Sequence, residues 1–207
     1  MTTARDLMIV AMDVARDEES ARPVERGDMS LALAGAELVD LLGAEAAHLD
    51  GERIVPGYRP TITDGMLDEA ASALVREAPQ ESVEDWLWRR GRGLAGAYLA
   101  ALEADGQLTR RRRRWSPFRS GTAVLADSAT RRRAADRWAA REPVLTALAV
   151  AAGVGEEGAA QAPDVADDDM ATVLATVHDA VRELEAERQR RAIEQTAYDN
   201  IWRDPGG

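Results

Sequence analysis

Five consecutive arginines, from Arg110 to Arg114, are followed directly by Trp115 and, three residues later, by Phe118. Guanidinium groups bind phosphate through paired N–H donors. Aromatic rings beside them are suited to the head-group layer of a membrane. The chemistry that these residues could perform is therefore the binding of a polyanion. A run of like charges is also typical of a solvated or disordered loop, but the two aromatic side chains favour a surface that a partner covers.

Charge is distributed unevenly along the chain. From Arg89 to Arg141 there are 14 arginines and 4 acidic residues, a net charge of +10. The rest of the chain has 12 arginines and 33 acidic residues, a net charge of −21. Polyanions are attracted to the first region and repelled by the remainder, so the pattern says more about partners than about the fold.

The sequence offers little support for catalysis or metal binding. It has no cysteine, which excludes disulfides, thiolate zinc sites and cysteine nucleophiles. His48 is expected on a hairpin surface and His178 in a polar contact on a helix, and neither has the spacing of a metal motif. There is no Walker loop, nucleophile elbow or dinucleotide fingerprint, and three aspartates at 167–169 are expected to complement a helix dipole. We therefore predict no enzymatic activity, no cofactor and no metal.

Composition favours a helical fold. The 207 residues suffice for one substantial core, and with 45% hydrophobic but only 4% aromatic residues that core must consist largely of Ala, Leu and Val. We predict a mainly α protein with a single domain over residues 1–207. There is no signal peptide and no apolar run of about 18 residues, so the chain is expected to be soluble and cytoplasmic.

Capping residues indicate where the helices begin. Between the first two helices, the stretch from Asp13 to Gly27 is charged and aperiodic, which predicts a loop. Gly106 predicts the end of the helix before the arginine run. Residues 153–169 predict a mobile acidic loop, and residues 204–207 a frayed tail. The expected helix starts or caps are Thr3, Asp28, Asp64, Ser82, Asp127, Glu142 and Asp169.

Two β-hairpins are expected among the helices. One projects from the domain and pairs the arginine run with residues 122–125, and the other is a short hairpin around Asp50-Gly51. Trp86 and Trp138 fall on apolar helical faces, which predicts core positions. For Trp115 and Phe118 two interpretations stay open: they insert into a membrane or contact a second copy, or they pack the hairpin onto its own helices.

The order of these segments resembles the Golgi phosphoprotein 3 family. The resemblance covers most of residues 4 to 185, and it rests on the order and spacing of several short motifs. It implies an almost wholly helical domain with a projecting β-hairpin. It also implies binding of phosphatidylinositol 4-phosphate, an adaptor role and self-association through the hairpin. The matching motifs are Asp6-Leu-Met-Ile-Val-Ala-Met-Asp13, Leu31-Ala-Leu-Ala-Gly-Ala-Glu-Leu-Val-Asp-Leu41, Asp64-Gly-Met-Leu-Asp-Glu-Ala70, Ser82-Val-Glu-Asp-Trp-Leu87 and Leu102-Glu-Ala-Asp-Gly-Gln-Leu108.

The head-group site that the resemblance implies is only partly present. An aromatic residue of the family corresponds to Glu25, and an arginine to Ala34. Of two further arginines, one corresponds to Arg92 and the other to Ala95. Each change removes a hydrogen-bond donor or a stacking surface, and Glu25 adds repulsion toward a phosphate. The sequence therefore predicts attraction to anionic lipid by diffuse charge.

The sequence thus predicts a peripheral protein on the inner face of the membrane, with anionic phospholipid or phosphoinositide head groups as partners. A protein client and a weak homo-oligomer are also expected. The alternative is a nucleic-acid-binding module in which the hairpin acts as a basic wing over phosphates. The candidate head-group residues are Arg89, Arg90, Arg92, Arg110, Arg111, Arg112, Arg113 and Arg114, and the candidates for membrane insertion or oligomer contact are Trp115 and Phe118.

Overall fold

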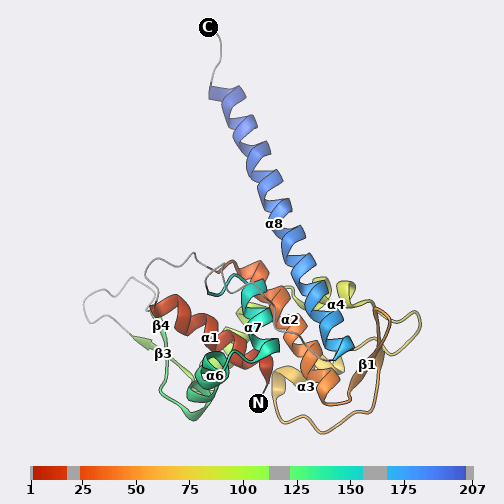
Figure 1. Cartoon of the computed structure of the whole chain (residues 1–207). Helices are drawn as coiled ribbons and strands as arrows, with labels where there is room; N and C mark the ends of the chain where they lie inside the picture. Colours follow the sequence, from red (N-terminus) through yellow and green to blue (C-terminus); the bar gives the residue numbers. More distant parts are fainter. Residues whose placement is uncertain (1, 18–23, 112–121, 156–166, 204–207) are drawn as a thin grey trace.

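The computed structural model describes residues 2–17, 24–111, 122–155 and 167–203 (Figure 1). In these segments eight helices and two antiparallel hairpins form a mainly α fold, as the composition predicted. The helices are α1 (Thr3–Asp17), α2 (Arg26–Gly43), α3 (Gly65–Ser72), α4 (Val83–Arg90), α5 (Leu94–Ala104), α6 (Ala129–Ala139), α7 (Pro143–Ala151) and α8 (Asp168–Arg203). The strands are β1 (Ala47–Asp50), β2 (Arg53–Pro56), β3 (Leu108–Arg111) and β4 (Thr122–Leu125).

Helix α2 is the centre of the fold. Its residues from Met29 to Val39 are buried all round, because α1, α4, α5, α7 and α8 each pack against it. A helix that is apolar on every face is typical of such a position. From α4, the Trp86 ring is fully buried in the core, and its Nε1 donates a hydrogen bond to the Ala34 carbonyl oxygen at 3.0 Å.

Several predicted helix starts are confirmed, because each rests on a bond between neighbouring residues. Asp64 accepts hydrogen bonds from the N–H groups of Met66 and Leu67. Ser82 Oγ accepts from the N–H of Asp85, and Glu142 caps α7 directly before Pro143. Local capping chemistry is therefore enough to place these three starts.

Other starts differ from the prediction. The predicted loop from Asp13 to Gly27 was wrong at both ends, since α1 continues to Asp17 and α2 begins at Arg26 after Glu25. Asp13 pairs with Arg131 of α6 at 2.7 Å, a contact that joins the second half of α1 to α6. Asp28 does not cap α2 but lies in its first turn and pairs with Arg188 of α8.

Two further boundaries are corrected in the second half of the chain. Helix α6 is capped by Ser128, whose Oγ accepts from the N–H of Arg131, and not by Asp127. Of the predicted acidic loop, residues 156–166 lie outside the described residues, but Asp168 and Asp169 already belong to α8. Asp169 also accepts a hydrogen bond from the N–H of Leu49 at 3.1 Å, so it ties α8 to the first hairpin. The predicted frayed tail lies outside the described residues.

This first hairpin, which was predicted around Asp50-Gly51, is confirmed as β1 and β2, with His48 opposite Val55 and Asp50 opposite Arg53. Helix α8 extends beyond the part that packs against the other helices. Its first half covers α2, and Figure 1 shows the second half extending away from the body. Consistent with this, the side chains of Ile193 and Tyr198 are 70% and 59% exposed.

A close contact between α2 and α8 gives a first testable prediction. A Cβ atom at Gly35 would lie 2.3 Å from Val177 Cγ2, and a β-branched valine has little freedom to move. We expect Gly35→Ala to lower the free energy of unfolding by about 1–3 kcal/mol. Gly96→Ala in α5 is the matched control, because a Cβ there meets nothing within 4 Å and alanine should stabilise the helix by about 0.5–1 kcal/mol. Urea unfolding checks both values, and equal stability of the two variants would contradict the packing described here.

Candidate functional site

The stem of the basic hairpin is anchored in the core. Helix α5 is terminated by Gly106, which has a φ of +69°, and the Gln107 N–H donates to the Leu102 carbonyl oxygen at 2.8 Å. Leu108 and Leu125 then face each other across the strands, and both are buried. The stem is therefore a fixed extension of the helical body. Figure 1 places it at one end of the molecule, opposite β1 and α3.

The arginine run starts at the outer end of this anchored stem. Arg110 and Arg111 belong to β3, and Arg111 is opposite Thr122 at the open end of the ladder. The other predicted residues of the run, Arg112, Arg113 and Arg114, lie outside the described residues, as do Trp115 and Phe118. The structure thus defines the stem that carries the run and the backbone of its first two arginines.

Arg89 lies on the surface of α4, and its side chain forms hydrogen bonds with nearby residues. Its Nε and Nη2 donate to the two carboxylate oxygens of Glu81 at 2.6 and 2.7 Å, and Nη2 also donates to the Ala73 carbonyl oxygen. The guanidinium carbon lies 5.2 Å from the centre of the Trp86 ring. These contacts use the Nε and Nη2 donors of Arg89, and the pKa of Arg89 is raised, chiefly by its hydrogen bond to Glu81.

Arg90 points into the core rather than toward a surface. Its Nε and Nη2 donate to the two oxygens of Glu37, at 2.7 and 3.0 Å, and its Nη1 donates to Glu69 at 2.8 Å. The Glu37 side chain is fully buried, and the Tyr98 hydroxyl donates to it at 3.0 Å. Burial raises the pKa of Glu37, and the bonds from Arg90 and Tyr98 act in the opposite direction. The arrangement is a paired and hydrogen-bonded buried charge, which proteins tolerate.

Arg92 is exposed like Arg89, but it is the member of this trio that has no carboxylate partner among the described residues. It lies between Gly91 and Gly93 in the turn from α4 to α5, and it makes no hydrogen bond or ion pair with another described residue. The turn packs on the start of α2, where the Ala95 N–H donates to Ser30 Oγ at 3.1 Å. Of the other positions compared with the family's head-group site, Glu25 is exposed at the start of α2, and Ala34 and Ala95 are buried.

Three of the five other arginines of this region whose side chains the structure describes form ion pairs within the fold. Arg131 pairs with Asp13, Arg132 with Asp127, and Arg137 with Asp6 and Glu142. Arg133 and Arg141 are exposed and have no ion pair with another described residue. Among the arginines of residues 89–141 whose side chains the structure describes, Arg92, Arg133 and Arg141 are therefore the ones that form no ion pair with another described residue.

Neither histidine lies in a metal-binding arrangement. His48 is exposed on β1 and His178 is exposed on α8. Within the described segments, no group of three or more His, Asp or Glu side chains is placed to hold a metal ion. None of the helices in the described part of the chain is both long and apolar enough to cross a membrane.

The arrangement of these elements, a helical body with an anchored basic hairpin, agrees with a comparison against protein families. The model of the family described as Golgi phosphoprotein 3 (GPP34) matches residues 4–196, which is nearly the whole chain. The chain therefore belongs to the Golgi phosphoprotein 3 family. No curated protein matches it at a significant level.

Proposed function

We propose that this protein is a non-enzymatic adaptor that docks peripherally on anionic lipid head groups through its arginine hairpin. The observation that supports this most strongly is that the arginine run starts on an anchored stem: its first two residues, Arg110 and Arg111, belong to β3, which the buried residues Leu108 and Leu125 hold against the body. Outside residues 89–141 the chain carries a net charge of −21, so the acidic remainder turns away from an anionic surface and orients the hairpin toward it.

The binding free energy expected from the five arginines is suited to reversible association with a membrane. Each basic residue near an anionic membrane contributes about 1 kcal/mol, so five arginines provide several kcal/mol. Insertion of the Trp115 and Phe118 rings at head-group depth would add to this and make the docking less dependent on charge alone. Binding of this strength is reversible and is weakened by salt, and it does not anchor the protein permanently.

A nucleic-acid-binding wing is the second candidate, because phosphate backbones attract the same arginines. Co-sedimentation with phosphatidylcholine vesicles, with and without phosphatidylglycerol, tests the lipid proposal beside a gel-shift assay with DNA and RNA. We expect binding to the anionic vesicles, a loss of binding at high salt, and a weaker, sequence-independent shift with nucleic acid. Strong nucleic-acid binding without vesicle binding would favour the wing.

Selectivity for one phosphoinositide is expected to be weak. Arg89 and Arg90 are paired with Glu81, Glu37 and Glu69, which leaves Arg92 as the arginine of that trio without an ion pair to another described residue. A single exposed ion pair provides about 0–1 kcal/mol, too little to separate lipids of equal charge. Vesicles with phosphatidylinositol 4-phosphate should therefore bind within about threefold of charge-matched vesicles with phosphatidylglycerol or cardiolipin. Tenfold tighter binding to the phosphoinositide would demonstrate a specific pocket and contradict this expectation.

A further inference from the structure

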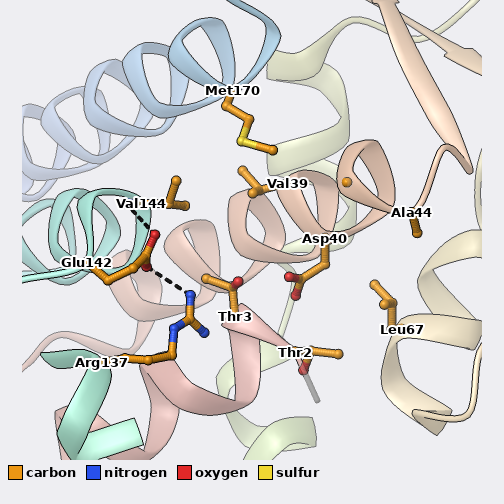
Figure 2. Close-up of a pocket in the computed structure, with 11 residues that line it drawn as sticks. Thr2, Thr3, Val39, Asp40, Ala44, Leu67, Arg137, Glu142, Val144 and Met170 are labelled. Atoms are coloured by element: carbon orange, nitrogen blue, oxygen red, sulfur yellow. Dashed lines mark hydrogen bonds and ion pairs between the residues drawn. The ribbon is translucent and has the colours of Figure 1, made fainter. Parts of the chain in front are cut away.

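A pocket between the first turns of α1, α7 and α8 is completed by the protein's own groups (Figure 2). Glu142 accepts a hydrogen bond from the Leu145 N–H at 2.9 Å and pairs with Arg137 at 2.8 Å. Asp40 accepts a hydrogen bond from the Ala4 N–H at 3.4 Å. The two carboxylates of the pocket therefore serve the starts of α7 and α1, and these bonds explain them without a ligand.

The second half of α8, in contrast, lies outside the packed body. Arg188 pairs with Asp28 of α2, and every side chain that the structure describes beyond it is exposed. We call residues 189–203 the arm, and Figure 1 shows it extending away from the other helices. Most helical stability in proteins comes from packing against other elements, yet the aromatic side chain of Tyr198 is 59% exposed here. A partner that covers one side of the arm would therefore stabilise it.

One face of α8 carries charges of alternating sign where the arm begins. Glu187, Arg191, Glu194 and Tyr198 follow one another at intervals of four, three and four residues, so they lie on one face of the helix. Within the helix, Arg191 Nε lies 3.5 Å from Glu187 Oε2, and Glu194 forms no ion pair with another described residue. We call these four residues the arm stripe. Along the helix its order is acid, base, acid and hydroxyl.

The arm stripe is complementary to itself in one orientation. When two copies of it run antiparallel with Arg191 opposite Glu194, the same register places Glu187 opposite Tyr198, whose hydroxyl can donate to a carboxylate. A two-fold axis forms each of these pairs twice. A parallel pair of arms in register would instead place like charges opposite each other, which is unfavourable. The charges therefore favour an antiparallel contact between two copies.

We infer that the arm binds the arm of a second copy of this chain in antiparallel orientation. A contact between two single helices of this length buries less surface than a standard protein interface, so the dimer is weak, and salt weakens it further. The contact does not involve the basic hairpin. Formation of the dimer is therefore independent of the lipid docking proposed above.

Complementary charge reversals test this pairing. Arg191→Glu places carboxylates opposite each other in its own dimer, and Glu194→Arg places guanidinium groups opposite each other. Each variant should therefore dimerise at least about tenfold more weakly than the wild type. An equimolar mixture of the two variants restores both pairs of opposite charge, and its heterodimer should be within about threefold of the wild-type affinity. Sedimentation equilibrium of the full-length proteins measures these constants, and mixing does not restore a loss that is caused by fraying of the arm.

Two further variants are controls. Arg182→Glu makes the same charge change at an exposed position of α8 outside the arm stripe and should dimerise like the wild type. Replacement of Arg110 to Arg114 by serine should also leave the dimer unchanged. A wild type that stays monomeric up to millimolar concentration, or a mixture that stays monomeric where the wild type dimerises, would overturn the inference. If the wild type is monomeric and Arg191→Glu binds phosphatidylglycerol vesicles more weakly, the arm contacts a lipid surface instead of a second copy.

Discussion

Replacement of Arg90 by alanine should destabilise the protein by about 3–5 kcal/mol, because it leaves the charge of Glu37 buried without its cation. Glu37 is fully buried, and both of its oxygens accept hydrogen bonds from Arg90. The Tyr98 hydroxyl would remain its principal donor. Urea unfolding at pH 7 measures the change. Arg92→Ala, two residues away and exposed, is the control and should stay within about 0.5 kcal/mol of the wild type.

The destabilisation should depend on pH in a defined direction. Burial raises the pKa of Glu37 above its ordinary value of 4.5, and loss of Arg90 removes the interactions that hold it down. An acid with a raised folded-state pKa lowers stability as pH rises from its unfolded pKa through its folded pKa. The difference between wild type and Arg90→Ala should therefore be largest near pH 8 and smaller near pH 5. A difference that stays constant between these pH values would mean that Glu37 does not carry the buried charge.

The helical framework was predictable wherever its signals are local. Asp64, Ser82 and Glu142 cap helices through bonds to residues two or three positions away, so the sequence contains both partners side by side. The end of α1 was not predictable in this way. Its second half contains Asp13, which pairs with Arg131, 118 residues distant. A pattern of neighbouring residues cannot reveal a contact of this kind, because its two partners are far apart in the sequence.

The candidate site was likewise predictable only where its signals are local in the sequence. The arginine run is evident from residue types alone, whereas the inward direction of Arg90 follows from a partner on α2, 53 residues away. One signal was present, because Glu37 interrupts the otherwise apolar sequence from Ala34 to Leu38. A carboxylate in such a stretch requires a buried cation, and the two arginines at the end of α4 were the candidates nearest to a core helix.

Replacement of Arg110 to Arg114 by serine should abolish binding to anionic vesicles. At about 1 kcal/mol for each arginine, the loss amounts to several kcal/mol, which corresponds to a decrease in affinity of more than a hundredfold. Folding should be unaffected, because the stem is fixed by Leu108 and Leu125. Vesicle co-sedimentation gives the affinity, and thermal unfolding verifies that the variant has the stability of the wild type.

The most direct test of membrane docking compares this variant with one that loses equal charge elsewhere. The control replaces five exposed arginines outside the hairpin by serine, namely Arg59, Arg76, Arg182, Arg190 and Arg191. Both variants have the same net charge, so their difference on phosphatidylglycerol-containing vesicles reports the position of the arginines. The hairpin variant should remain in the supernatant while the control still sediments with the vesicles. Equal loss of binding by the two variants, or undiminished binding by the hairpin variant, would contradict docking through the arginine hairpin.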